Sequence, residues 1–281
     1  MSPTPTSPRR PISIAVTSGK GGVGKTSVAV NLAVALARLR HRVAILDADF
    51  GLGNVDVLMG LAPSAHVGHV LVGEKSLREV LVTGPGGVQV IPASSGMPQL
   101  TALTDGQWDR LGDSLDEVAD DFDYVIIDTG AGISDNVVEA IRLASRALVV
   151  TALEPTAVVD AYALIKLMSA TDPAQEIEVV VNNARDASEA QLVFTQLQVA
   201  ATRFLKRRIH YAGFITHDPA VRDAVLVQRP IVDHLPQSPA SRCFRILASR
   251  LAAAAPGRAT GLRLVRPTPP APVTPGTPQC A

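Results

Sequence analysis

The sequence predicts one α/β domain with a doubly wound, mostly parallel sheet flanked by helices. Its clearest sign is a glycine-rich loop that follows an apolar run at residues 12–16 and precedes a helix-periodic run at residues 28–39. Such a loop joins a strand to a helix. Further apolar runs at 42–47, 122–128 and 146–151 alternate with helix-periodic stretches. Buried strands that alternate with helices are typical of parallel sheets with helical crossovers.

The composition limits the folded unit and its partners. Hydrophobic residues make up 47% of the 281 residues, enough for a substantial core in a single domain over residues 12–255. Residues 1–11 and 256–281 are rich in proline and are expected to be disordered. The formal net charge is zero and no apolar run is long enough to cross a membrane, so neither a polyanion-binding nor a membrane-spanning protein is expected. Cys243 and Cys280 form no disulfide or metal-ligand pattern.

The glycine-rich loop has the pattern G-x-x-x-x-G-K-[ST] of a phosphate-binding loop. Its glycines let the backbone turn tightly and present N–H groups to an anion, and the N-terminus of the following helix adds a favourable dipole. Lys25 is expected to reach the β- and γ-phosphates of ATP, and the Thr26 hydroxyl to bind Mg²⁺. The residues predicted to hold the nucleotide are Gly19, Gly21, Gly22, Val23, Gly24, Lys25, Thr26 and Ser27.

A second lysine, Lys20, follows the first glycine of this loop. The chain has only five lysines beside twenty-one arginines, and two of the five lie here, where compact ammonium charges suit phosphate. The loop resembles the deviant Walker A loop of the MinD/ParA-type ATPases, which share a P-loop fold. The resemblance implies that Lys20 reaches across a dimer to the nucleotide of the other subunit. The alternative is that Lys20 is only a solvated loop charge.

Two aspartates, Asp47 and Asp49, end the strand expected at residues 42–47. Acidic residues at the carboxyl end of a parallel strand face the ligand crevice of an open sheet. The segment resembles switch I of the MinD-type family, which implies that Asp49 positions and polarises the attacking water. The same resemblance gives Asp47 a supporting role for the metal and the loop. The alternative is two aspartates that stabilise a turn or cap a helix.

Residues 57–108 are less regular. The pattern predicts short helices at 57–60 and 76–81, a strand at 88–92, a surface loop at 97–103 and a helix at 105–120 whose tryptophan lies in the core. The second of these helices has the spacing of a capping box. None of these elements carries a catalytic motif.

A strand over residues 122–128 ends in Asp128, as in a Walker B motif. At this distance after a phosphate loop, the Asp128 carboxylate is expected to hold Mg²⁺ through water. Residues 129–132 would form switch II, because their two glycines let the backbone approach the γ-phosphate.

The second half of the chain continues the alternation of strands and helices. Helices are expected at 135–143, 155–168, 187–205, 219–226 and 239–254, and strands at 146–151, 178–182 and 209–215. Asn182 and Asn183 end one of these strands, and an asparagine amide offers the adenine edge both a donor and an acceptor. The family uses an asparagine there, and Asn182 is favoured, with turn formation as the alternative. The segment 216–232 is expected to wall the base pocket.

Two runs, at 128–132 and 154–166, resemble the FlhG family (also FleN or YlxH), MinD-like regulators of flagellar number and position. Cell-division MinD typically has serine-proline in place of Thr129 and Gly130. The resemblance covers about residues 12–252. It implies ATP and Mg²⁺ as cofactors, slow hydrolysis that depends on an ATP-bound homodimer, and a cytoplasmic protein that associates peripherally with the inner face of the cell membrane.

The same resemblance implies partners in flagellar assembly, namely a FlhF-type GTPase, a FleQ-type transcription regulator and flagellar switch proteins. Residues 1–11 lack the D-Q-A-x-x-L-R motif with which some relatives stimulate the GTPase. The alternative function is a MinD-like division-site or ParA-like positioning ATPase, although DNA is not expected as a partner. The helix at 239–254 either lies on lipid or packs on the domain, and residues 261–266 are a weaker membrane candidate.

Overall fold

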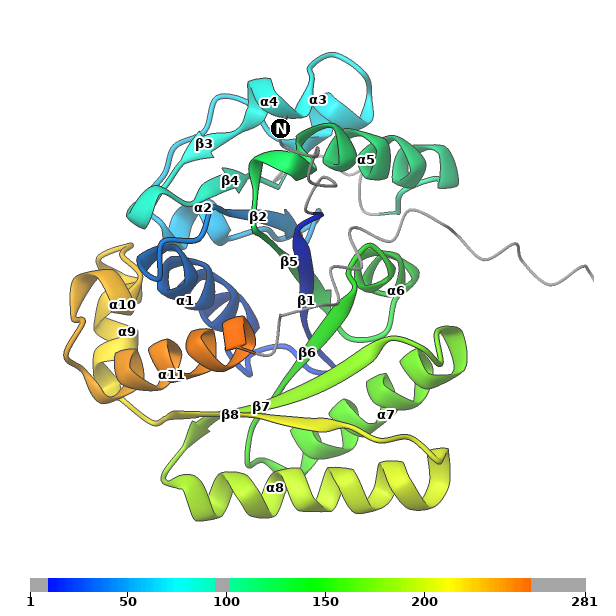
Figure 1. Cartoon of the computed structure of the whole chain (residues 1–281), viewed down its shortest axis with the longest axis vertical. Coiled ribbons are helices and arrows are strands. Elements are labelled where there is room, and N and C mark those ends of the chain that lie inside the picture. Colours follow the sequence, from blue (N-terminus) through cyan, green and yellow to red (C-terminus); the bar gives the residue numbers. More distant parts are fainter. Residues whose placement is uncertain (1–9, 94–101, 254–281) are drawn as a thin grey trace, which may run out of the picture.

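A central eight-stranded sheet, covered by helices on both faces, organises the computed structural model, which describes residues 10–93 and 102–253 (Figure 1). Its strands are β1 (Ile12–Ser18), β2 (Val43–Ala48), β3 (Val82–Thr83), β4 (Gln89–Ile91), β5 (Tyr124–Ala131), β6 (Arg146–Thr151), β7 (Glu176–Ala184) and β8 (His210–Thr216). Their order across the sheet is β3-β4-β2-β5-β1-β6-β7-β8. Each neighbouring pair is parallel except β3 and β4. The predicted fold class is confirmed.

The helices form two layers. They are α1 (Lys25–Arg38), α2 (Val55–Leu58), α3 (Val67–Leu71), α4 (Leu77–Val80), α5 (Asp105–Val118), α6 (Asp135–Arg142), α7 (Pro155–Thr171), α8 (Ala187–Ala200), α9 (Pro219–Leu226), α10 (Ile231–His234) and α11 (Pro239–Ala253). Helices α1, α9, α10 and α11 cover one face of the sheet, and α5, α6, α7 and α8 cover the other (Figure 1). The two main clusters of buried apolar side chains fill these two interfaces.

The strand order brings three loops to one edge of the sheet. β1 lies between β5 and β6, and β2 lies on the far side of β5, so the chain winds outward from β1 in both directions. In open parallel sheets the ligand crevice lies at the carboxyl ends of the strands, where the winding changes direction. The connections that follow β1, β2 and β5 therefore meet at that edge, and all the predicted phosphate and metal residues lie on them or at the strand ends.

The last helix packs on the domain. Phe244, Leu247 and Leu251 on α11 are at most 2% exposed and face α1 and β8. Of the two readings left open for this segment, the structure supports packing, because its apolar side is already buried. No helix in the described ranges 10–93 and 102–253 has the length and apolarity that a membrane crossing requires.

Several local features differ from the sequence expectations. Helix α3 had no periodic signal, because it is only five residues long. The helix expected at 187–205 is regular only to Ala200 and ends in one π-helical turn, Ala201–Leu205. The strand β5 continues through Ala131, so the predicted switch II begins inside a strand. The capping box at Ser76 and Glu79 is present as predicted.

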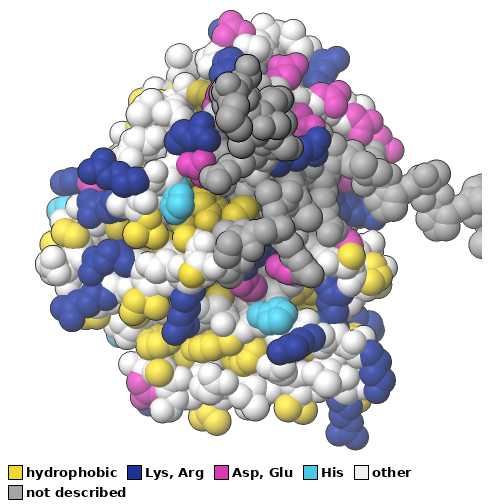
Figure 2. Space-filling model, in the orientation of Figure 1, with side chains coloured by type: hydrophobic (Ala, Val, Ile, Leu, Met, Phe, Trp, Pro, Cys, Tyr) yellow, Lys and Arg dark blue, Asp and Glu magenta, His cyan; other side chains and the backbone are white. Residues whose placement is uncertain are grey.

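Charge is unevenly distributed although the formal net charge is zero. Figure 2 shows Asp and Glu side chains gathered at the end of the molecule that carries α5, and Lys and Arg side chains over α9–α11 and near the end of α8.

Several earlier expectations lie outside the described residues. These are the disorder of residues 1–9 and 256–281, most of the loop 97–103, the membrane candidate 261–266, and Cys280.

Candidate functional site

The loop between β1 and α1 has the backbone of an anion-binding turn. Gly22 and Gly24 adopt φ of 82° and 87°, the left-handed region that favours glycine. Gly24 is also the N-cap of α1, and no side chain caps this helix. The first N–H groups of α1 are therefore left to a ligand, and the helix dipole favours a negative one.

Asn182 holds this loop from the end of β7. Its Nδ2 donates to the Val23 carbonyl at 2.8 Å, and a Cβ added at Gly24 would collide with the same amide. Asn183, at φ 58°, instead places its Oδ1 2.7 Å from His217 Nδ1. The favoured base-contacting residue is thus beside the phosphate loop, and its amide nitrogen is already used by the loop backbone.

Lys25 and Asp128 form a buried ion pair across the site. Lys25 Nζ lies 2.8 Å from Asp128 Oδ1 and 3.2 Å from Thr26 Oγ1, and the two charged side chains are 8% and 1% exposed. The other oxygen, Asp128 Oδ2, is buried and has no hydrogen-bond partner among the described residues. A buried polar atom without a partner needs an explanation, and hydrated Mg²⁺, which binds carboxylate and hydroxyl oxygens, fits this one.

Asp47 lies beside Asp128, because the β2–β5 register pairs the two residues. Its Oδ1 accepts the Asp49 N–H at 3.1 Å and its Oδ2 accepts the Val55 N–H at 3.0 Å. Burial raises the pKa of Asp47 to about 7, and the Asp128 carboxylate adds to the rise, while the two N–H groups and Lys25 oppose it. Burial also raises the pKa of Asp128, against the opposing charge of Lys25. Two buried carboxylates share one ammonium group, so the site favours a further cation.

The raised pKa of Asp47 predicts a pH dependence of stability. An aspartate whose pKa is higher in the folded state stabilises the fold below pH 4 and loses that contribution as the pH rises towards 7. Without nucleotide and Mg²⁺, Asp47 should lower the unfolding free energy of the wild-type protein by at most about 4 kcal/mol between pH 4 and pH 7. The Asp47→Asn variant should lack this decrease. Urea denaturation of both proteins at several pH values measures it. If the unfolding free energy changed with pH equally in the two proteins, the expectation would be contradicted.

Asp49 faces the end of β5. Its Oδ1 accepts the Leu52 N–H at 3.2 Å, and a Cβ added at Gly130 would lie 3.9 Å from its Cγ. Gly132, at φ 94°, donates its N–H to the Ser18 carbonyl at 2.9 Å. The structure therefore brings the predicted switch I and switch II together, next to the phosphate loop.

A cavity of about 160 Å³ opens between the phosphate loop and the ends of β7 and β8. Its walls include Ser27, Asn182, Thr216, Asp218 and Val221. Its position beside the loop suits the base and ribose of a nucleotide.

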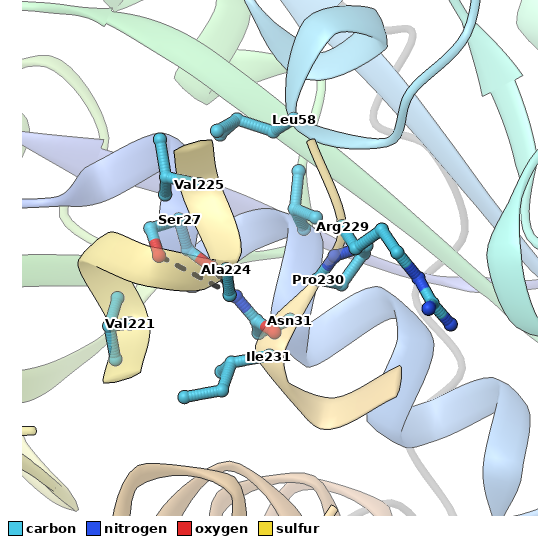
Figure 3. A pocket seen from close by; sticks show the side chains of 10 residues that line it. Ser27, Asn31, Leu58, Val221, Ala224, Val225, Arg229, Pro230 and Ile231 are labelled. Atoms are coloured by element: carbon cyan, nitrogen blue, oxygen red, sulfur yellow. Dashed lines mark hydrogen bonds between the residues drawn. The ribbon is translucent and has the colours of Figure 1, made fainter. Parts of the chain in front are cut away.

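The expectation that all of segment 216–232 walls this cavity is only partly right. Arg229, Pro230 and Ile231 line a separate hollow between α1, α2 and α9 (Figure 3). That hollow has about 10 Å³, room for one water molecule at most.

Lys20 is held by its own chain. Its Nζ lies 3.0 Å from Glu154 Oε2 and 2.8 Å from Thr156 Oγ1. In the sequence, the run at 154–166 indicates only a family branch, and no site role is expected for Glu154 or Thr156. They lie here because β6 pairs with β1, which brings the start of α7 to the phosphate loop.

No cluster of three or more His, Cys, Asp or Glu side chains is arranged to hold a metal ion within residues 10–93 and 102–253. A Mg²⁺ ion at Asp128 and Thr26 would therefore complete its coordination with water and phosphate oxygens. This is the usual arrangement for Mg²⁺, which keeps several waters and binds few carboxylates.

Comparison with known proteins places these features in context. The AAA domain family matches residues 12–179. The antiactivator FleN of Pseudomonas aeruginosa is 44% identical over 238 residues, which cover 85% of this chain and 85% of that protein. The flagellum site-determining protein YlxH of Helicobacter pylori is 33% identical over 212 residues, which cover 74% of this chain and 71% of that protein.

Solved structures share the fold. The cell division ATPase MinD of Pyrococcus furiosus superposes with a TM-score of 0.75 at 24% identity, over 87% of this chain and 99% of that one. A chain of the MinC:MinD cell division protein complex of Aquifex aeolicus gives a TM-score of 0.71 at 28% identity, over 86% of this chain and 96% of that one.

Proposed function

The chain belongs to the MinD/ParA-type ATPases of the AAA domain family, in the branch that contains FleN and YlxH, and from this premise we propose that it is an ATP-dependent dimerising switch that regulates flagellar number or placement. The observation that carries the ATPase part is the meeting of Lys25, Asp128 and Asp47 at one sheet edge, with an unpartnered carboxylate oxygen beside Thr26. The flagellar part rests on the similarity to FleN.

In this proposal the site residues divide the binding and the chemistry between them. The loop N–H groups and Lys25 bind the β- and γ-phosphates, and Thr26 and Asp128 hold Mg²⁺, which neutralises charge on the transferring phosphoryl group. Asp49 positions the attacking water and accepts its proton. Asp47 fixes the Asp49 loop through the hydrogen bonds described above and supports the metal. Asn182 positions the phosphate loop and faces the base.

A second copy of the chain completes the site by supplying its Lys20. Support comes from exposed apolar side chains near the phosphate loop, which such a dimer would cover. They are Leu52 (76% exposed), Ile133 (57%), Leu153 (44%) and Val159 (65%). They lie in or next to the two switch segments, in the β6–α7 connection and in α7. Of these elements, α7 and the end of switch II adjoin the loop that carries Lys20. Hydrolysis would then be slow and would depend on the dimer.

The partners and location follow from relatives. One relative is an antiactivator, which supports a transcription activator of the FleQ type as a partner, together with a FlhF-type GTPase and flagellar switch proteins. Cytoplasmic location with peripheral membrane association is part of the proposal. The apolar side of α11 is buried, so membrane contact would have to use another part of the chain.

A strain that carries Lys25→Ala tests the flagellar function. Loss of the ammonium group weakens phosphate binding, so the strain should show the same change in flagellar number and swimming as a deletion strain. Electron microscopy of stained cells counts the flagella. Normal flagella in both strains would remove the flagellar function but leave the ATPase activity, whereas salt-sensitive DNA binding by the purified protein would favour a ParA-like positioning ATPase.

A further inference from the structure

We propose that Glu154 and Thr156 are positioning residues that hold Lys20 on its own chain, so that each subunit must release Lys20 before it can serve a partner. The inference rests on the proposed dimer. It assigns Glu154 the task of setting the protein concentration at which ATP drives dimerisation.

The contact joins two parts of the molecule that are already fixed relative to each other. Glu154 is the N-cap of α7 and Thr156 lies in its first turn. A Cβ added at Gly19 would collide with the backbone carbonyl of Asp160, so the turn that carries Lys20 is seated directly on α7. Little further ordering is needed for Lys20 to reach Glu154, which lowers the entropic cost that usually weakens an exposed ion pair.

The two partners of Lys20 use two of its three N–H donors. The ammonium group donates to a carboxylate and to a hydroxyl at once, which leaves one donor. Glu154 also lines the cavity beside the phosphate loop. If a partner's triphosphate approached Lys20 while Glu154 still held it, the new negative charges would lie beside a carboxylate and repel it. Transfer of Lys20 to the partner therefore opposes its pairing with Glu154.

Breaking the Lys20–Glu154 ion pair costs little free energy, but the cost arises in both subunits of a dimer. Lys20 and Glu154 are 37% and 66% exposed, and exposed ion pairs change an equilibrium constant by about two- to fivefold. A symmetric dimer breaks two such pairs. Removing the charge of Glu154 should therefore shift dimerisation towards lower protein concentration, and the effects of the two pairs multiply to about four- to twenty-five-fold.

Glu154→Gln tests the inference, because glutamine keeps the shape and removes the charge. With saturating Mg²⁺ and ATP, the protein concentration for half-maximal dimer, measured by analytical ultracentrifugation, should fall about four- to twenty-five-fold. The concentration for half-maximal ATP turnover should fall with it, and added salt should reduce the difference between variant and wild type. Thr156→Val should act in the same direction with a smaller effect.

Asp172→Asn is the matched control, because it removes the same charge from the far end of α7. It should leave the protein concentration for half-maximal dimer (the half-point) unchanged. An unchanged or raised half-point in Glu154→Gln, with a wild-type protein that dimerises, overturns the inference, and a raised one means that Glu154 acts within the dimer. A wild-type protein that stays monomeric with ATP contradicts the proposed function instead.

Discussion

Asp49→Ala should bind ATP and dimerise but lose hydrolysis by about 10²- to 10⁴-fold, the range for removing a general base from a reaction. Asp49 lies against Gly130 at the end of β5, and a Leu52 N–H holds its Oδ1. In the proposed function this carboxylate positions the water that attacks the γ-phosphate. Lys25, Thr26 and Asp128 remain in place, so nucleotide affinity should change little.

The measurements are phosphate release under single-turnover conditions and ATP affinity by calorimetry. Asp56→Ala is the control, because Asp56 lies on the same segment but caps the Val57 N–H and should keep wild-type turnover. Normal turnover by Asp49→Ala would mean that another group positions the water. Loss of ATP binding would mean that Asp49 acts on the loop structure and not on the chemistry.

The position of the phosphate and metal residues could be predicted from the sequence for a geometric reason. Asp47 and Asp128 each follow a short apolar run, and the carboxyl ends of parallel strands meet at one edge of a sheet. The sequence pattern alone therefore predicts that the two aspartates lie close together, and the register of β2 and β5 pairs them. The raised pKa of these carboxyl groups could not be predicted in the same way, because it depends on how completely they are buried.

The contacts of Lys20 could not be predicted, because they depend on which strand lies beside β1. Pairing of β6 with β1 brings the start of α7 to the phosphate loop, but the sequence gives the order of strands along the chain and not across the sheet. The same limit explains the separate hollow at Arg229–Ile231 (Figure 3). Whether residues 229–231 wall the nucleotide cavity or a neighbouring space depends on the packing of α10 against α1 and α9.

Lys20→Ala should bind ATP as a monomer but lose ATP-dependent dimerisation, with turnover reduced by at least about 10²-fold. A cation supplied in trans to a transferring phosphoryl group contributes about 10³- to 10⁵-fold where it has been measured in other nucleotide hydrolases. A dimer interface that depends on two such contacts loses both in this variant. Gel filtration with ATP and turnover at several protein concentrations measure the two effects.

Two further variants separate charge from position. Lys20→Arg keeps the charge but spreads it over a planar group, so partial dimerisation is expected. Lys75→Ala removes an exposed lysine just before α4 and should behave as wild type. If Lys20→Ala kept wild-type turnover and the wild-type protein stayed monomeric with saturating ATP, Lys20 would be only a loop cation neutralised by Glu154. The shared site proposed between two copies of the chain would then be excluded.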